Sequence, residues 1–432
     1  MIAALLVAAA LQHWLVVNDI HLDPFSHAGV VRGADTTPVL WHLSVPEMRR
    51  TVPNPRVIIL GGDNLAHHFP TLAVDAHRAA VSAAVQVDQT IAHDLGTAYP
   101  NAQFLVAQGN NDDPCGDYRS ETGGPYLQAL ARIWQPLVDR HGAAPGFTAQ
   151  FMHGGYYTAK LPIAGGEAIV LNSDIWSIVY GGGCSSQTGG AGRSELVWLQ
   201  RELSRLSRGD NAVVVMHIPP GYDPDSTMLA HRFLAVPFLR PDDNTALMKD
   251  LAAHASQIRA IYGAHTHRYD FRLIGTIPMF IGSSISPVYN NNPAFYDVTV
   301  DASGNIHDIV PYVYDLRSEQ WLREPSFDHM YGVKGFTAAA LASIAKRIVN
   351  DPQTRATWEA AYDVWSWRVG DLYRDWVPFA CAHTQQGSGY AGCAKTSQRT
   401  KFAEIAILCI VILFVAIVVG LLYLRAKRRN RA

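Results

Sequence analysis

The chain alternates short aliphatic runs with longer amphipathic stretches, and this alternation constrains its fold more than any other feature. Six runs rich in Val and Ile, bounded by Gly, Asn, Asp or His, are typical of strands buried on both faces. They lie at 14–18, 57–60, 103–107, 168–171, 212–216 and 258–262. Amphipathic patterns predict helices over 74–95, 125–140, 194–206 and 245–255. Strands that alternate with helices favour an α/β architecture.

The part of the chain after the sixth strand follows a different pattern. Residues 271–314 are sheet-like, and Ser303-Gly304-Asn305 indicates a hairpin turn. Residues 335–376 are helical in pattern and carry four Trp, which predicts a small helical subdomain before the end of the chain. The 35 Lys and Arg against 37 Asp and Glu give a net charge of −2, so we expect no duplex nucleic acid to be bound through its phosphates.

Two apolar segments predict the topology with respect to a membrane. Residues 405–424 are uncharged and, at about 1.5 Å per residue, reach about 30 Å, the thickness of a bilayer core. We therefore predict a transmembrane helix over 402–424, rather than a buried core helix. The basic tail 425–432 would lie in the cytosol by the positive-inside rule. Residues 1–11 resemble the apolar region of a signal peptide, with a buried first strand as the alternative.

These segments predict a single-pass type I membrane protein of the secretory or endolysosomal pathway or the cell surface, with nearly the whole chain outside the cytosol. The cysteines are compatible with an oxidising compartment. Cys409 lies in the predicted span, and four others remain. Cys381 and Cys393 would close a short loop and are the preferred pair; Cys115–Cys184 follows by elimination.

Polar side chains follow the predicted strands at the point where each strand ends, and five of these strand ends form a set of candidate ligands. In open α/β sheets, ligands bind beyond the carboxyl ends of the strands, so the five loops can converge. Carboxylate, imidazole and amide groups without a thiolate suit Zn, Mn or Fe. The sequences at these strand ends are Asn18-Asp19-Ile20-His21, Gly61-Gly62-Asp63-Asn64, Gly109-Asn110-Asn111-Asp112, His217-Ile218-Pro219-Pro220-Gly221 and His265-Thr266-His267.

The order of these motifs resembles that of the calcineurin-like metallophosphoesterases. The motifs are D-x-H, G-D-x, G-N-[HN]-[DE], H-x-P-P-G and H-T-H. Five stretches are similar to the acid sphingomyelinase-like branch of this family. They are GGDNLAHH (61–68), WLQREL (198–203), HIPPG (217–221), HTHRYDF (265–271) and the stretch 280–295. The resemblance implies a four-layer α/β/β/α sandwich over residues 12–315. It also implies a helical C-terminal subdomain over 316–400.

The resemblance also implies a site for two divalent metal ions, Zn in the first place and Fe or Mn as alternatives. Asp63 would bridge the two ions. The first ion would be held by Asp19, His21, Asp63 and His267, and the second by Asp63, Asn110, His217 and His265. Such a site would hydrolyse a phosphodiester by attack of a metal-activated hydroxide, without a covalent enzyme intermediate.

Two catalytic positions and two substrate positions follow from the same resemblance. The family often has His where this chain has Asn111, and an amide cannot act as a general acid. His67 stands where the branch has a second candidate acid, so we predict that it protonates the leaving group. Ser284 and Asn292 fall in the stretch that resembles the substrate loop of the branch.

Three functions are compared. The first is a membrane-anchored phosphodiesterase acting on a phospholipid, a nucleotide or another diester. The second is an endopolyphosphatase, because related enzymes of that kind also have G-N-N-D and a phosphoanhydride needs less protonation. The third is a metal-bearing receptor ectodomain without catalysis, which the complete ligand set disfavours.

Overall fold

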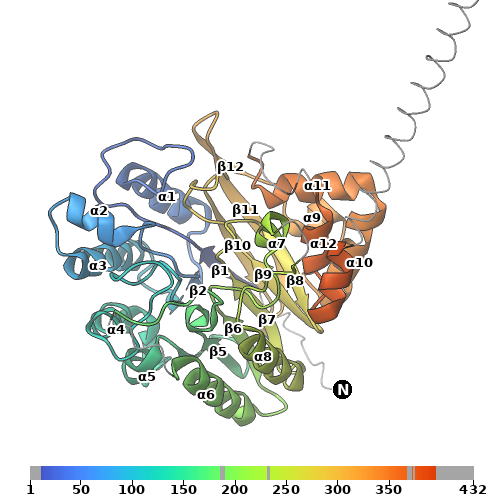
Figure 1. Cartoon of the computed structure of the whole chain (residues 1–432), viewed down its shortest axis with the longest axis horizontal. Helices are drawn as coiled ribbons and strands as arrows, with labels where there is room; N and C mark the ends of the chain where they lie inside the picture. Colours follow the sequence, from blue (N-terminus) through green and yellow to red (C-terminus); the bar gives the residue numbers. More distant parts are fainter. Residues whose placement is uncertain (1–10, 185–189, 231–233, 367–371, 373–374, 396–432) are drawn as a thin grey trace, which may run out of the picture.

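The computed structural model describes residues 11–395, except 185–189, 231–233, 367–371 and 373–374 (Figure 1). All but the last residue of the predicted signal peptide lies outside the described residues, as do the predicted span 402–424 and the basic tail. Among the described helices, none combines the length and the apolar character needed to cross a bilayer.

Two sheets form the centre of the described chain, each with six of its strands. The first sheet has the order β12 (Gln320–Arg323), β11 (Ile306–Asp315), β10 (Ala294–Val300), β1 (Gln12–Val17), β2 (Val57–Leu60) and β3 (Gln103–Val106). The second has the order β4 (Tyr157–Lys160), β5 (Gly166–Val170), β6 (Asn211–Val215), β7 (Ile258–Gly263), β9 (Ile277–Ile281) and β8 (Asp270–Ile274). The six strands predicted from the aliphatic runs are confirmed as β1, β2, β3, β5, β6 and β7.

The predicted strands are parallel to one another within each sheet. Val16 pairs with Ile59, which in turn pairs with Leu105, and Val214 pairs with Ile261. The carboxyl ends of β1, β2 and β3 therefore lie at one edge of the first sheet, and those of β5, β6 and β7 at one edge of the second. The predicted hairpin is also confirmed: antiparallel β10 and β11 join through Asp301–Asn305, with Gly304 at φ 86°.

The sheets face each other across an aromatic and aliphatic core. The rings of Trp14 and Tyr262 have centroids 6.0 Å apart, and those of Phe280 and Tyr296 are 5.1 Å apart. Helices α1 (Pro38–Thr51), α3 (Ala80–Ala98) and α4 (Pro125–Val138) share the buried core of the first sheet, and α6 (Ala191–Arg205) and α8 (Pro241–Ala253) pack on the second (Figure 1). The predicted α/β class with two sheets is thus confirmed.

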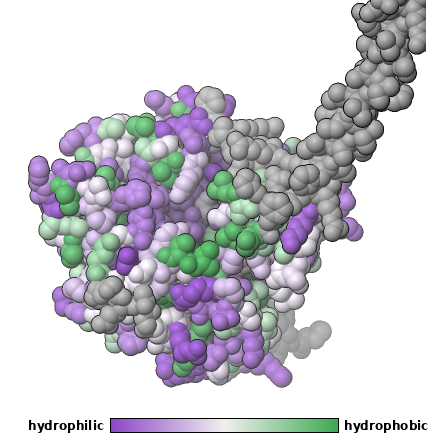
Figure 2. All heavy atoms as spheres, viewed as in Figure 1, coloured by the Kyte–Doolittle hydropathy of each residue, from purple (hydrophilic) through white to green (hydrophobic). Residues whose placement is uncertain are grey.

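The remaining described helices complete the fold, and four of them form the helical region beside β8 and β9 (Figure 1). These four are α9 (Phe327–Tyr331), α10 (Ala338–Asn350), α11 (Pro352–Tyr362) and α12 (Val377–Ala382). The others are α2 (Phe69–Asp75), α5 (Phe147–Gly154), α7 (Pro224–Leu229) and the 3-10 turns η1 (Arg140–Gly142) and η2 (Ser173–Trp176). On the face in Figure 2 the surface is mainly hydrophilic, with hydrophobic residues gathered near its middle.

The predicted helix over 74–95 is wrong at its beginning, because two helices meet there. Helix α2 ends at Asp75, and His77 takes a left-handed φ of 55°. The N–H of Arg78 donates to the carbonyl of Ala73, and that of His77 to Val74, which is the hydrogen-bond pattern of a helix C-terminus. The residue in the left-handed position is His rather than Gly, so the sequence contains no ordinary stop signal.

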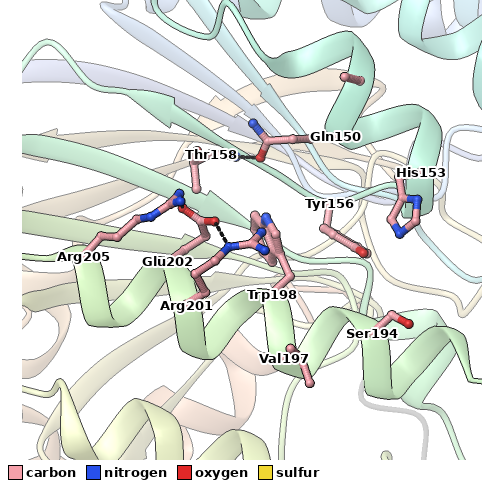
Figure 3. Close-up of a pocket in the computed structure, with 11 residues that line it drawn as sticks. Gln150, His153, Tyr156, Thr158, Ser194, Val197, Trp198, Arg201, Glu202 and Arg205 are labelled. Atoms are coloured by element: carbon pink, nitrogen blue, oxygen red, sulfur yellow. Dashed lines mark hydrogen bonds and ion pairs between the residues drawn. The ribbon is translucent and has the colours of Figure 1, made fainter.

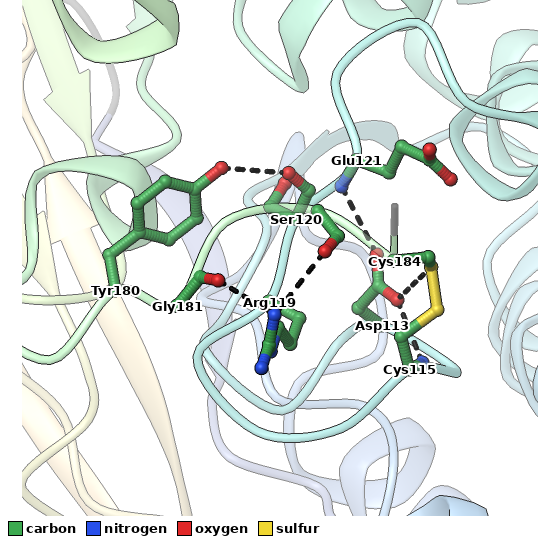
Figure 4. The surroundings of a disulfide bond; sticks show 9 residues. Asp113, Cys115, Arg119, Ser120, Glu121, Tyr180, Gly181 and Cys184 are labelled. Carbon is green, nitrogen blue, oxygen red and sulfur yellow. Dashed lines mark hydrogen bonds between the residues drawn. A yellow bond between two sulfur atoms is a disulfide. The ribbon is translucent and has the colours of Figure 1, made fainter. Parts of the chain in front are cut away.

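Both predicted disulfides are confirmed. Cys115–Cys184 joins residues 69 apart in sequence, and Cys381–Cys393 joins residues 12 apart. The first is surrounded by contacts between the same two loops (Figure 4): Arg119 donates to the carbonyl of Gly181, at 2.7 Å, and the Tyr180 hydroxyl donates to that of Ser120. The loop after β3 is thereby fixed to the loop after η2.

Candidate metal centre

The strand-end loops bring the seven predicted metal ligands together. The ligand atoms of Asp19, His21, Asp63 and His267 lie within 4.8 Å of one another. Those of Asp63, His217 and His265 form a second such group, so Asp63 belongs to both. Asn110, the seventh predicted ligand, has its Oδ1 atom 3.0 Å from Nε2 of His217. The Asp63 carboxylate is therefore shared by two groups of ligand atoms, each of which could hold a metal ion.

The orientation of the imidazoles shows that these atoms fit a cation. Nδ1 of His21 lies 2.9 Å from the carbonyl of Leu65, and Nδ1 of His217 lies 2.8 Å from that of Gly61. A carbonyl only accepts hydrogen bonds, so each Nδ1 carries a proton, and in the neutral ring each Nε2 presents a lone pair. Nε2 of His21 is 3.1 Å from Nε2 of His267, so one cation could be bound by both nitrogens.

Burial favours the neutral, metal-binding form of three of these histidines. It lowers the pKa of His21 to about 4 and that of His265 to about 3, and it holds the pKa of His267 well below its usual range. His217 differs: burial lowers its pKa, but the charge of Asp63 and the hydrogen bond to it raise the value to about 10. The surroundings of His217 and Asp63 therefore favour a positive charge between them. A bound cation would supply that charge.

The two carboxylates respond to burial in opposite ways. Burial raises the pKa of Asp19 to about 8, because water no longer stabilises its charge. Burial acts in the same direction on Asp63, but the imidazoles of His217 and His21 outweigh it and hold its pKa well below the usual range. The surroundings of Asp63 thus favour its charged form.

The ligands are held in a backbone conformation that L-residues disfavour. Five of them have a left-handed φ: 46° at Asp19 and His21, 59° at Asp63, 72° at His265 and 54° at His267. Residues other than Gly rarely adopt this conformation, and such strain is concentrated at functional sites. Gly109 must lack a side chain, because a Cβ atom there would overlap the Asp63 carboxylate.

A buried carboxylate that we did not predict holds the Asp63 loop. Oδ2 of Asp112 accepts from the N–H of Asp63 at 2.8 Å and from that of Gly109 at 2.9 Å. Its Oδ1 accepts from Asn64 and Leu65, at 2.6 and 3.2 Å. The acidic position of the G-N-[HN]-[DE] motif, which contains Asp112, was the available signal for this role.

His67 lies beside the ligand group and contacts Asp35, a partner that could not be identified from the sequence. Its ring stacks on His21 with centroids 4.1 Å apart, and its Nδ1 is 2.8 Å from Oδ1 of Asp35. Burial would lower the pKa of His67, but the hydrogen bond and charge of Asp35 outweigh it and raise the pKa. Because Nδ1 is bonded to Asp35, Nε2 is the nitrogen available to a substrate.

Asn111 is directed at a ligand rather than at a substrate. Its backbone N–H donates to Oδ1 of Asp63 at 2.7 Å, and its Nδ2 donates to Oδ2 at 2.8 Å. Both bonds stabilise the charged form of Asp63. The structure therefore gives Asn111 the role of orienting that carboxylate.

The two predicted substrate residues do not join this group. Ser284 is fully buried, and its hydroxyl donates to the carbonyl of Ser286 at 2.6 Å. Asn292 is also buried, and its Nδ2 donates to the carbonyl of Val364 at 3.0 Å. Both side chains stabilise the loop between β9 and β10, and their contact with substrate stays a prediction.

Aromatic side chains lie on both sides of the ligands. The ring of Tyr289, which is 50% exposed, lies 4.7 Å from that of His267. On the other side, Phe238 and Tyr118 approach His265 with ring centroids 5.5 and 6.3 Å away. Tyr118 belongs to the loop held by the Cys115–Cys184 disulfide, so that bond also shapes the surroundings of the centre.

The cavity in Figure 3 is separate from this centre. It has a volume of 440 Å³ and lies between α5 and α6. Tyr156 and Trp198 line it, and Arg201 and Arg205 both bind Glu202 at its rim. None of the seven predicted ligands lines it.

Two facing sheets with buried Asp and His groups at the strand ends could hold the metal ions of a phosphoester hydrolase. Residues 13–269, more than half of the chain, match the family described as calcineurin-like phosphoesterase, and the chain belongs to that family. Enzymes of this family use divalent metals, and the Asp and His cluster described above could hold them.

Two curated proteins are similar to the chain. "Sphingomyelinase phosphodiesterase D" of Dictyostelium discoideum is 29% identical over 342 residues, which cover 74% of this chain and 71% of that protein. "Cyclic GMP-AMP phosphodiesterase SMPDL3A" of Homo sapiens is 20% identical over 312 residues, which cover 67% of this chain and 64% of that protein. These relatives confirm the resemblance to the acid sphingomyelinase-like branch.

Among solved structures, GAP50, the anchor in the inner membrane complex of Plasmodium, matches 81% of this chain and 95% of its own. The sequence identity is 10% and the TM-score is 0.36, which is too low to add to the family assignment.

Proposed function

We propose that this chain is a membrane-anchored, extracytoplasmic phosphodiesterase of the acid sphingomyelinase-like type, with two divalent cations that are Zn in the first place. The position of Asp63 carries the proposal. Its carboxylate belongs to both ligand groups, and it is held by Asn111 and by the Asp112 network. A carboxylate shared by two donor sets is the arrangement that a two-cation site requires.

The chain's own residues would prepare this site for an anionic diester. Two cations, when bound, supply an activated water nucleophile near neutral pH and neutralise charge on the phosphoryl oxygens. His21 and His217 are fixed by their bonds to backbone carbonyls, so their Nε2 atoms need little rearrangement to bind.

The departing oxygen of a phosphodiester needs a proton, and we propose that His67 gives it. Asn111 binds Asp63 through its amide and has no proton to transfer. The contact with Asp35 orients the His67 ring and leaves Nε2 for the substrate. A dedicated acid of this kind favours an ester, whose leaving group is an alcohol, over a phosphoanhydride.

The similar proteins support a diester as the substrate class. One is named for sphingomyelin and the other for cyclic GMP-AMP, and both names specify a phosphodiesterase. We infer that the substrate is a phospholipid or a nucleotide. Polyphosphate is the second candidate, because Asn111 replaces the His that the family often has.

The membrane topology is part of the same proposal. The apolar segment 405–424 with its basic tail supports a C-terminal anchor, and the apolar N-terminus supports entry into the secretory pathway. The two disulfides support an oxidising compartment, since cytosolic proteins rarely keep such bonds.

The test is metal content and turnover of the full chain in detergent, compared with Asp63→Asn. We expect about two Zn per chain and hydrolysis of bis(p-nitrophenyl) phosphate. We also expect weaker activity on p-nitrophenyl phosphate and none on polyphosphate. Asp63→Asn should lose both metals and activity. Cleavage of polyphosphate alone would select the second candidate, and diester hydrolysis unaffected by Asp63→Asn would refute this site.

A further inference from the structure

The turn at residues 362–366, directly after α11, has a conformation that its side chains disfavour. Val364 has φ 54° and Trp365 has φ 51°. The N–H of Val364 donates to the carbonyl of Ala361 and that of Trp365 to Ala360, which is the pattern of a Schellman helix end. That position normally takes Gly, whereas Val364 is β-branched and fully buried. Such strain persists only where surrounding contacts fix it.

The first set of contacts joins turn 362–366 to the loop that carries His265 and His267. The N–H of Tyr269 donates to the carbonyl of Tyr362 at 3.2 Å. The guanidinium of Arg268 lies 3.2 Å from Oδ1 of Asp363; the Asp363 side chain is buried, with 5% exposed, and that of Arg268 is partly buried, with 14% exposed. Arg268 directly follows His267, so this ion pair acts one residue from a predicted ligand.

The second set of contacts joins the same turn to the loop between β9 and β10. Nδ2 of Asn292 donates to the carbonyl of Val364 at 3.0 Å, and the Ser366 hydroxyl donates to the carbonyl of Asn290. This loop also carries Tyr289, whose ring meets the edge of His267. Turn 362–366 therefore holds both the loop that carries His267 and the loop whose Tyr289 contacts His267.

From these contacts we propose that turn 362–366 is a positioning element of the metal centre, with Arg268 and Asp363 as positioning residues for His267. The helical region beside β8 and β9 then contributes to metal binding without supplying a ligand (Figure 1). The inference rests on the proposed function for its link to catalysis, but the effect on zinc binding and loop order does not require turnover.

The physical reason is the narrow tolerance of a metal site. His267 Nε2 lies 3.1 Å from His21 Nε2 and 3.5 Å from Oδ1 of Asp19, in a strained backbone conformation. Without its bonds to turn 362–366, loop 265–269 would relax towards ordinary φ values and move this nitrogen. Groups that orient metal ligands typically change metal affinity about 10–100-fold when they are replaced.

The experiment compares Arg268→Gln, Arg268→Lys and Ser366→Ala with Arg140→Gln in the full chain. Arg140 is a matched control, because it donates to the carbonyls of Tyr99 and Ala102, beside the opposite end of β3. Zinc affinity is measured by competition with a chromogenic chelator. Amide hydrogen exchange of residues 265–270 and 289–292 is measured in the metal-free protein.

We expect Arg268→Gln to weaken zinc binding about tenfold or more, and Arg268→Lys to retain part of the affinity. Exchange should accelerate at 265–270 in Arg268→Gln and at 289–292 in Ser366→Ala. Arg140→Gln should lower the unfolding midpoint without either effect. The proposal is overturned if Arg268→Gln and Arg140→Gln bind zinc equally.

If Arg268→Gln does not fold, the proposal is tested with Arg268→Lys and Ser366→Ala. Unchanged amide hydrogen exchange in both of these variants overturns the proposal. A wild-type protein that binds zinc but hydrolyses no diester would refute the proposed function alone.

Discussion

Asp112 offers the strongest test of how this fold supports its metal centre, through the substitution Asp112→Asn. Its two carboxylate oxygens accept four backbone N–H groups, two at each oxygen. Asn keeps one oxygen and replaces the other with an NH₂ donor. Two of the four buried donors therefore lose their acceptor, whichever way the amide is turned.

The magnitude follows from that count. A buried donor without a partner costs about 1–3 kcal/mol, so two cost about 2–6 kcal/mol. The total stability of a folded domain is about 5–15 kcal/mol, so this loss is a large fraction of it. Because either orientation of the amide releases two backbone donors of the segment that carries or adjoins Asp63, we also expect metal affinity to fall about 10–100-fold.

Asp301→Asn is the matched control. Oδ1 of Asp301 also accepts from two backbone N–H groups, those of Ser303 and Asn305, but in a partly exposed turn. Asn retains that oxygen and water reaches the turn, so we expect a cost below about 1 kcal/mol. Urea unfolding followed by Trp fluorescence, with zinc retention against a chelator, provides both measurements. Equal midpoints for the two variants would refute the reasoning.

Two further predictions concern catalysis and pH. His67→Gln should lower kcat by about 10²–10⁴-fold on a diester with an alcohol leaving group, but far less on a p-nitrophenyl diester, whose leaving group needs no acid. Equal losses on both would show that His67 does not protonate the leaving oxygen. Burial holds the pKa of Glu195 well above its usual range, so the contribution of Glu195 to wild-type stability falls as pH rises above about 4.3, the unfolded value. Glu195→Gln retains the acceptor for the Asn172 N–H and carries no charge. The urea midpoint of this variant should therefore exceed that of the wild type by a margin that grows from pH 5 to pH 8. Parallel curves of midpoint against pH for the two proteins would contradict this.

The strands and the convergence of the ligands could be predicted because both depend on local pattern. Runs such as 57–60 and 212–216 are aliphatic throughout, which indicates strands buried on both faces. Once strands alternate with helices, the carboxyl ends must meet, and the residues that follow them must lie close together. The geometry of Asp63 between His21 and His217 is a consequence of this topology.

The groups that hold the ligands could not be predicted in the same way. Asp35 lies 32 residues from His67 in sequence, and Asp363 lies 95 residues from Arg268. A lone Asp in a loop is ordinarily solvated, so nothing local distinguishes Asp35 or Asp363 from other carboxylates. Their roles depend on which loops the sheets bring into contact.

The same argument explains the left-handed residues, which local preference would exclude. Each non-Gly residue in this conformation costs about 1–2 kcal/mol, so the five strained ligands together cost about 5–10 kcal/mol. Local sequence preference alone would therefore predict another backbone at these positions. The conformation persists because Asp112 holds the loop of Asp63, and the N–H of His265 donates to Asp19. Removing such a support should therefore release strain at the ligands, so metal binding should weaken together with the stability of the fold.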